Sequence, residues 1–184
     1  MKSGRARAAI QVEVLLLVGI LAAVAVATLS YLKGLDLARR EQGALATLAR
    51  LSAALGAFNP PAGFPLPEPI LRHVIDREGA LAAEGRFLQE GSWLREGYLF
   101  RASPIPAEPG ERQRFALVAW PAAHGGSGNA AFVVGPDGEC KETRNPRGRY
   151  DGPGKGPDPS STISTDRKGR IAADGEEWIG VRLP

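Results

Sequence analysis

One stretch near the start of the chain constrains its fold more than any other feature. Residues 14–32 carry no charged side chain, and a helix of these 19 residues would be about 28 Å long, close to the hydrocarbon thickness of a bilayer. The sequence therefore predicts a membrane-spanning helix over residues 9–33. The preceding leader, residues 1–8, is basic, which favours a single pass with the N-terminus in the cytoplasm and a head outside the cytoplasmic membrane.

The same stretch also has the features of a secretory signal peptide. Ala25, Val26 and Ala27 form a small-x-small cleavage site after a charged start and an apolar middle. Cleavage there would release a secreted or periplasmic binding module that begins at Thr28. A retained helix is favoured by the carboxylate of Glu13 at the front of the apolar run and by a helical pattern that continues past Ala27.

The pattern after residue 33 predicts that the same helix continues with one apolar face. Over residues 34–58, apolar side chains recur at three- and four-residue spacing, and most charged residues fall elsewhere on the helical wheel. Five prolines between residues 59 and 69 then prevent the helix from continuing. The apolar positions are Leu45, Leu48, Leu51, Leu55 and Phe58.

The rest of the chain predicts a small head, so the expected fold class is α+β. Residues 59–96 form a Pro-rich connector with a short helix near residues 69–82, and residues 97–145 follow a period of two that is typical of an antiparallel sheet. The amphipathic part of the long helix is expected to cover one face of this sheet. Residues 146–184 are rich in Gly and Pro, which predicts a loop or disordered tail that could return as an edge strand. The expected strands are 97–103, 114–121, 129–135 and 139–145, with 176–184 as the edge.

Charge argues against a nucleic-acid-binding protein. The formal net charge of +3 equals the three basic residues of the leader, and the chain from residue 9 onward has 20 basic and 20 acidic residues. One basic cluster remains, for which a solvated loop is the commoner explanation and a DNA contact the alternative. Its members are Lys141, Arg144, Arg147 and Arg149, with Tyr150 beside them.

Residues with catalytic or metal-binding chemistry form no recognisable pattern. His73 and His124 are the only histidines and lack metal-ligand spacing, and the single cysteine, Cys140, excludes an internal disulfide. The sequence therefore predicts no enzyme, no cofactor and no metal centre. A calcium site would draw on aspartates of the tail that are too scattered to indicate one: Asp151, Asp158, Asp166 and Asp174.

The segment "AIQVEVLLLVGILAAVAVATL" resembles the N-terminus of type IV pilins and type II secretion pseudopilins, in which a basic leader precedes a hydrophobic helix with glutamate at its fifth mature position. With Ala9 as the first mature residue, Glu13 is the fifth. The elements "GYLFR", "AWP" and "SGN" of the head are also similar to elements in bacterial prepilin-like proteins.

This resemblance implies a membrane-anchored, non-catalytic assembly subunit with a pilin-like fold. A prepilin peptidase would cut between Ala8 and Ala9, and Glu13 would neutralise the N-terminal amine of a neighbouring subunit. Such leaders usually have glycine and phenylalanine where this chain has Ala8 and Ala9, so a degenerate cleavage site and an uncleaved anchor are both open.

The residues themselves allow two further interpretations of the span. A carboxylate in the first turns of a helix is favoured by the helix dipole, so Glu13 could also be a tolerated interfacial residue. Gly19, Ala23 and Ala27 lie four residues apart, which would let another helix approach closely, although general alanine richness explains the spacing equally well.

Overall fold

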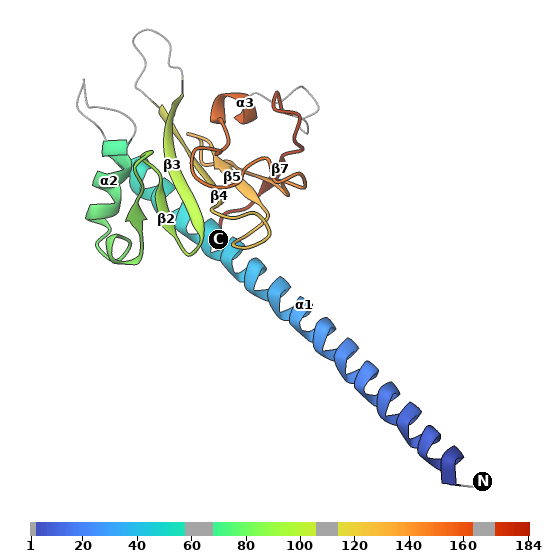
Figure 1. Cartoon of the computed structure of the whole chain (residues 1–184). Coiled ribbons are helices and arrows are strands. Elements are labelled where there is room, and N and C mark those ends of the chain that lie inside the picture. The colour runs from blue at the N-terminus through green and yellow to red at the C-terminus, as the bar shows by residue number, and fades with distance from the viewer. Residues whose placement is uncertain (1–2, 58–67, 106–113, 164–171) are drawn as a thin grey trace. The chain divides into compact units, whose positions relative to one another are not determined.

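The computed structural model describes residues 3–57, 68–105, 114–163 and 172–184. By backbone contacts the chain divides into two units, Met1–Asp36 and Leu37–Pro184. Phe58, Asp166 and the first four prolines of the connector, which the sequence analysis singled out, lie outside the described residues. The second unit contains the sheet (Figure 1), and the buried apolar side chains belong to it.

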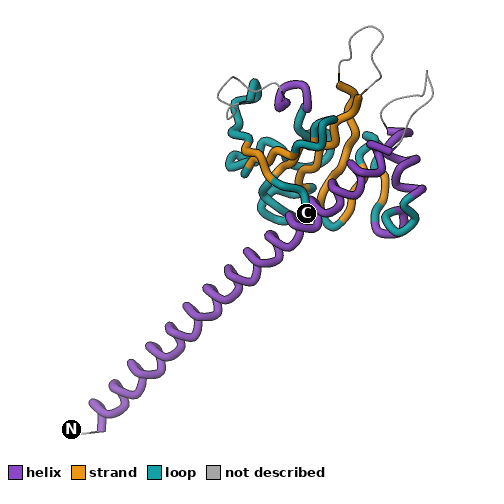
Figure 2. Tube along the Cα trace, turned by 180° about the vertical axis from the view of Figure 1, so that it is seen from behind, coloured by secondary structure: helices purple, strands orange, loops and turns teal. Residues whose placement is uncertain are grey.

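A single helix, α1 (Ser3–Ala57), confirms the expected long N-terminal helix and also includes most of the leader. The segment contains no proline, and its many alanines and leucines are strong helix formers, so nothing in it interrupts the backbone hydrogen bonds. Its second half belongs to the head, where the predicted apolar positions Leu48 and Leu51 are fully buried. Figure 2 shows this half lying across the strands.

The predicted short helix is present as α2 (Glu68–Arg77), but it ends about five residues earlier than expected. Gly79 adopts a left-handed conformation, with φ of +47°, which stops the helix as glycines commonly do at helix ends. A 3₁₀ turn, η1 (Ala82–Glu84), follows. The buried side of α2 carries Ile70, Leu71, Val74 and Ile75.

The sheet has seven antiparallel strands in sequential order, which confirms an α+β fold with a larger sheet than the sequence predicted. Two short strands that were not predicted precede the four expected ones, and the edge strand is confirmed near the C-terminus. The strands are β1 (Arg86–Phe87), β2 (Trp93–Arg95), β3 (Tyr98–Ile105), β4 (Arg114–Pro121), β5 (Ala131–Val134), β6 (Cys140–Thr143) and β7 (Ile179–Val181).

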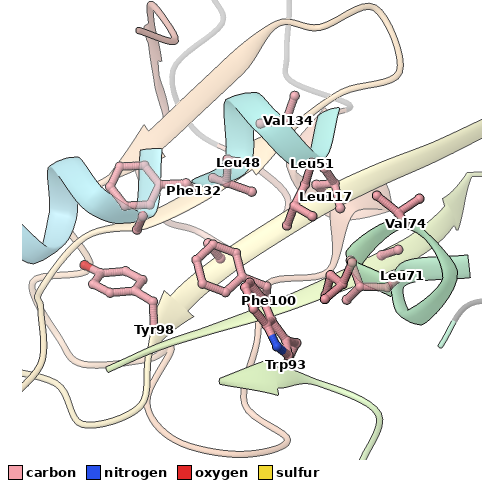
Figure 3. Close-up of a cluster of buried hydrophobic side chains, with 14 of the residues drawn as sticks. Leu48, Leu51, Leu71, Val74, Trp93, Tyr98, Phe100, Leu117, Phe132 and Val134 are labelled. Atoms are coloured by element: carbon pink, nitrogen blue, oxygen red, sulfur yellow. The ribbon is translucent and has the colours of Figure 1, made fainter. Parts of the chain in front are cut away.

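One face of the sheet packs against the two helices. Side chains alternate along each strand, so Tyr98 and Phe100 of β3 point to the same side as Phe132 of β5. Leu48 and Leu51 of α1 pack on this face (Figure 3). The two helices and this face together form the larger hydrophobic cluster of the molecule.

The opposite face is covered by the C-terminal segment, whose composition predicts a loop or disordered tail but which is partly ordered in the structure. A short helix, α3 (Pro159–Ile163), and ordered loops lie here, and they bury Tyr150, Ala172 and Trp178 against the strands. On the strands, Leu99, Val118, Trp120, Ala131 and Val133 complete this second cluster. The head therefore has three layers, and both faces of its sheet are covered.

Candidate functional site

The first part of α1 exposes large apolar side chains on every side. Five of them are consecutive, from Val14 to Val18, and at 3.6 residues per turn five consecutive residues encircle a helix. Each side chain of the set is at least 51% exposed. An apolar surface of this extent is typical of helices that contact lipid or other protein. The set comprises Val14, Leu15, Leu16, Leu17, Val18, Ile20, Leu21, Val24, Val26, Leu29, Tyr31, Leu32 and Leu35.

Within the described part of the chain, α1 is the one helix that is long and apolar enough to cross a membrane. Length and composition alone support this statement, and an N-terminal signal sequence has the same properties. The helix continues through Ala27 without a break, so the backbone does not mark the small-x-small motif as a boundary.

The structure places the predicted assembly residues along this exposed segment. Glu13 is exposed, and its side chain makes no hydrogen bond or ion pair with any residue whose side chain the structure describes. Gly19, Ala23 and Ala27 are exposed along one strip, and a methyl group added at Gly19 would contact nothing. Ala8 and Ala9 lie in the helical backbone of α1, and their side chains are outside the description.

In the head, the three sequence elements that carry the resemblance lie against one another. Gly97 and Ser127 approach so closely that a Cβ built on Gly97 would lie 2.6 Å from that of Ser127. The guanidinium of Arg101 lies 5.4 Å from the centre of the Trp120 ring, at the distance of a cation–π contact. "GYLFR", "AWP" and "SGN" therefore form one structural cluster around the ends of β3, β4 and β5.

Ala130, which follows "SGN", is held by side chains from two other elements. The Tyr98 hydroxyl donates a hydrogen bond to the carbonyl of Ala130 at 3.1 Å. Glu41 of α1 accepts hydrogen bonds from the backbone N–H groups of Asn129 and Ala130, at 3.0 and 3.2 Å. These contacts fasten the β4–β5 loop, residues 122–130, to the helix and to β3.

A second carboxylate and one arginine lie beside Glu41. Glu142 of β6 is buried, and Arg144 lies between the two acids, with Nε 3.1 Å from Glu142 Oε1 and Nη1 3.9 Å from Glu41 Oε2. The shorter contact lacks hydrogen-bond geometry and is ionic. Burial raises the pKa of Glu142; Arg144 opposes the rise and Glu41 adds to it. Burial also raises the pKa of the Tyr98 hydroxyl, and both carboxylates contribute.

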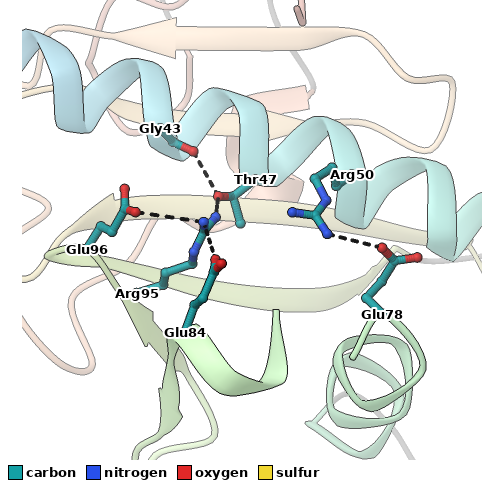
Figure 4. Close-up of polar contacts among 7 residues, drawn as sticks. All are labelled: Gly43, Thr47, Arg50, Glu78, Glu84, Arg95 and Glu96. Atoms are coloured by element: carbon teal, nitrogen blue, oxygen red, sulfur yellow. Dashed lines mark hydrogen bonds and ion pairs between the residues drawn. The ribbon is translucent and has the colours of Figure 1, made fainter. Parts of the chain in front are cut away.

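A further polar cluster joins α1 to the first strands (Figure 4). Arg95 of β2 donates a hydrogen bond to the Thr47 hydroxyl and forms ion pairs with Glu84 at 2.5 Å and Glu96 at 3.7 Å. Thr47 in turn donates to the carbonyl of Gly43. Arg95 thereby connects α1 with the β2–β3 hairpin.

The sequence did not predict the contacts of Glu41 and Arg95, although the position of Glu41 in the helix could have indicated its contacts. Glu41 lies four residues before Leu45 and seven before Leu48, which places it on the packed face of the helix and not among the solvent-facing charges. Arg95 gave no comparable signal, because Thr47 and Glu84 come from other segments of the chain.

The residues considered for catalysis do not come together in the described part of the chain. No group of three or more His, Cys, Asp or Glu residues could hold a metal ion there. His73 is exposed on α2, and the backbone N–H of His124 donates to Asp151. Cys140 is buried, and burial together with Glu142 raises the pKa of its thiol to about 12, so the reactive thiolate is disfavoured.

Two aspartates of the tail, and the tyrosine beside the basic cluster, make contacts that stabilise the head. Asp174 accepts hydrogen bonds from the Tyr150 hydroxyl and from Trp178 Nε1, within the second hydrophobic cluster. Tyr150 is therefore buried and offers no surface on which a nucleic-acid base could stack. Asp158 caps the first turn of α3 through Ser160.

No protein-family model, curated protein or solved structure matches this chain.

Proposed function

We propose that this chain is a membrane-anchored assembly subunit of a type IV pilus or a type II secretion-type system, pilin-like or pseudopilin-like and without catalytic activity. Its α1 helix would span the cytoplasmic membrane once, with the N-terminus in the cytoplasm and the head outside. The partners of the helix would be lipid and the corresponding helices of like subunits.

One observation carries the proposal. The same continuous helix has a segment that is apolar on every side and a segment that is apolar on one face, and only the second is buried within the chain. A soluble protein would have to leave thirteen large apolar side chains in water, which is strongly unfavourable at about 25 cal/mol for each Å² of exposed apolar surface. Lipid and neighbouring helices remove this cost.

Glu13 supports an assembly role in addition to an anchor. An ionised carboxylate within a membrane helix is costly unless it lies near the interface or meets a partner, and no residue of its own chain whose side chain is described supplies one. A positive group on a second subunit would complete the pair. Such a buried ion pair would set the register between subunits more than it would add to their stability.

The first experiment determines what happens to the N-terminus. The chain is expressed in a bacterium, membranes are extracted with alkaline carbonate, and the N-terminus of the retained protein is sequenced. Retention with a start at Ala9 supports a processed subunit, and retention with an intact Met1 supports an uncleaved anchor. A soluble product that starts at Thr28 would instead establish the released periplasmic module and overturn the proposal.

The second experiment tests assembly through Glu13. Two copies with different tags are co-expressed, and copurification from a mild detergent extract reports their association. We expect Glu13→Ala and Glu13→Gln to reduce copurification and Glu13→Asp to restore most of it, because only the last keeps the charge. Equal copurification by all variants, with normal membrane retention, would leave the glutamate as a tolerated interfacial residue.

A further inference from the structure

The cluster of Glu41, Glu142 and Arg144 has more negative than positive charge at the place where α1 meets the sheet. The side chain of Glu41 is 15% exposed and that of Glu142 is 11% exposed, whereas that of Arg144 is 73% exposed. The only cation of the cluster is thus mostly in water, where its attraction to the acids is screened. Two shielded carboxylates therefore share one exposed arginine, and burial keeps the pKa of Glu142 raised although Arg144 lowers it more than Glu41 raises it.

Among the described residues, the other groups placed against Glu142 carry no positive charge. Tyr98 of β3 and Cys140 of β6 are both neutral near pH 7, because burial and the carboxylates disfavour their anions. The residues paired with Glu142 on the neighbouring strands are Phe132 of β5 and Ile179 of β7, which are apolar. From α1 the facing group is Glu41.

The hydrogen bonds that Glu41 accepts connect this excess of negative charge to the β4–β5 loop. Its Oε1 holds the N–H groups of Asn129 and Ala130, so any force that moves Glu41 acts directly on the start of β5. Repulsion from an ionised Glu142 weakens the hydrogen bonds that Glu41 accepts from Asn129 and Ala130. Protonation of Glu142 removes this repulsion. Arg144 then pairs with Glu41 alone.

We infer that Glu41, Glu142 and Arg144 form a proton-controlled latch, which fastens the β4–β5 loop to α1 more firmly when Glu142 is protonated. The latch belongs entirely to residues 37–184 and does not depend on the proposed membrane function. The pKa of Glu142 is raised in the folded state, so its stabilising contribution is fully present below the pKa of an unfolded glutamate, about 4.3, and is lost as the pH rises through the folded value.

The first test compares Glu142→Gln with the wild-type full chain in neutral detergent micelles. Denaturant unfolding is followed between pH 5 and pH 8 by tryptophan fluorescence, since Trp93, Trp120 and Trp178 are all buried in the head. We expect the folding equilibrium constant of the variant to exceed that of the wild type at pH 8, and this ratio to fall at least about threefold by pH 5. The exposed Glu139, changed to Gln, is the matched control and should give a ratio near one throughout.

The second test observes the loop itself by hydrogen exchange of the Asn129 and Ala130 amides. Corrected for intrinsic exchange, their protection should rise from pH 8 to pH 5 in the wild type and be independent of pH in Glu142→Gln. Glu41→Ala should lose this protection at every pH. Arg144→Gln should move the transition to higher pH, because the arginine is the group that lowers the pKa of Glu142.

Two results would overturn the latch. A ratio of folding constants that does not change with pH would mean that Glu142 is not the controlling proton site. A Glu142→Gln variant that is less stable than the wild type at both pH 8 and pH 5 would mean that Glu142 simply anchors Arg144.

Discussion

Gly128 is the residue on which the packing of the β4–β5 loop depends most directly. A Cβ built on it would lie 2.6 Å from two carbon atoms of the Tyr98 ring, and Tyr98 is only 1% exposed, so the ring has no space into which it could move. The absent side chain lets Tyr98 reach the carbonyl of Ala130. The small residue in "SGN" is therefore a packing requirement.

The corresponding prediction is that Gly128→Ala destabilises the head by about 1–3 kcal/mol, the usual cost of overpacking a buried site. Gly126→Ala is the control in the same loop, because a Cβ there would lie at an ordinary contact distance of 3.4 Å from Ala123. Denaturant unfolding monitored by tryptophan fluorescence gives both free energies. Equal stability of the two variants would show that Tyr98 is not confined as described.

At the scale of elements, α1 has one backbone structure and two different surroundings. Leu48 is fully buried against the sheet, whereas Leu35, thirteen residues earlier in the same helix, is 51% exposed. Helix propensity is equal for the two leucines, so any difference in their contribution to stability comes from packing alone.

Leu48→Ala should therefore cost about 2–5 kcal/mol of unfolding free energy, because it removes buried methyl groups and leaves a cavity beside Phe132. Leu35→Ala, the same substitution at an exposed position of the same helix, should change stability by less than about 0.5 kcal/mol. The two variants are compared by denaturant unfolding in the same detergent. A similar loss in both would indicate that α1 is not held to the sheet through Leu48.

The elements that the sequence predicted are those with a strong local pattern. The long helix, β3 and β4 follow their periods over eight residues or more, and the structure confirms them. β1 and β2 are two and three residues long, too short for a period to appear, and only the pairing of β2 with β3 and of β1 with β2 defines them. Tyr150 and Trp178 could not be placed in a core from sequence, because the segment between them is dominated by residues typical of loops.

The sequence could likewise locate only part of the candidate site. The exposed segment with Glu13 is continuous in sequence, so composition alone located it. The latch residues Glu41, Glu142 and Arg144 come from α1, β6 and the loop after β6, and about a hundred residues separate the first from the other two. Only the folded chain brings them together.

At the scale of the whole molecule, the two units differ in how much apolar surface they expose. Residues 37–184 bury their large apolar side chains, with Ile179 as the one strongly exposed exception among the described residues. Residues 14–35 bury none. The head is therefore suited to water, and the first part of α1 to an apolar medium, which is the physical basis of the proposed anchor.

The proposed anchor can be tested by substituting arginine at either of two positions in α1. Arginine at the centre of a membrane helix costs about 2.5–3.5 kcal/mol on insertion scales, while near the end of the span its long side chain can reach the interface at little cost. Leu21→Arg should therefore shift the chain out of the carbonate-resistant membrane fraction, and Leu35→Arg should not. Tryptophan fluorescence should be native-like in both, because both leucines are exposed and all three tryptophans lie in residues 37–184. Equal retention of the two variants would contradict a spanning helix and would indicate that protein, not lipid, covers the apolar segment.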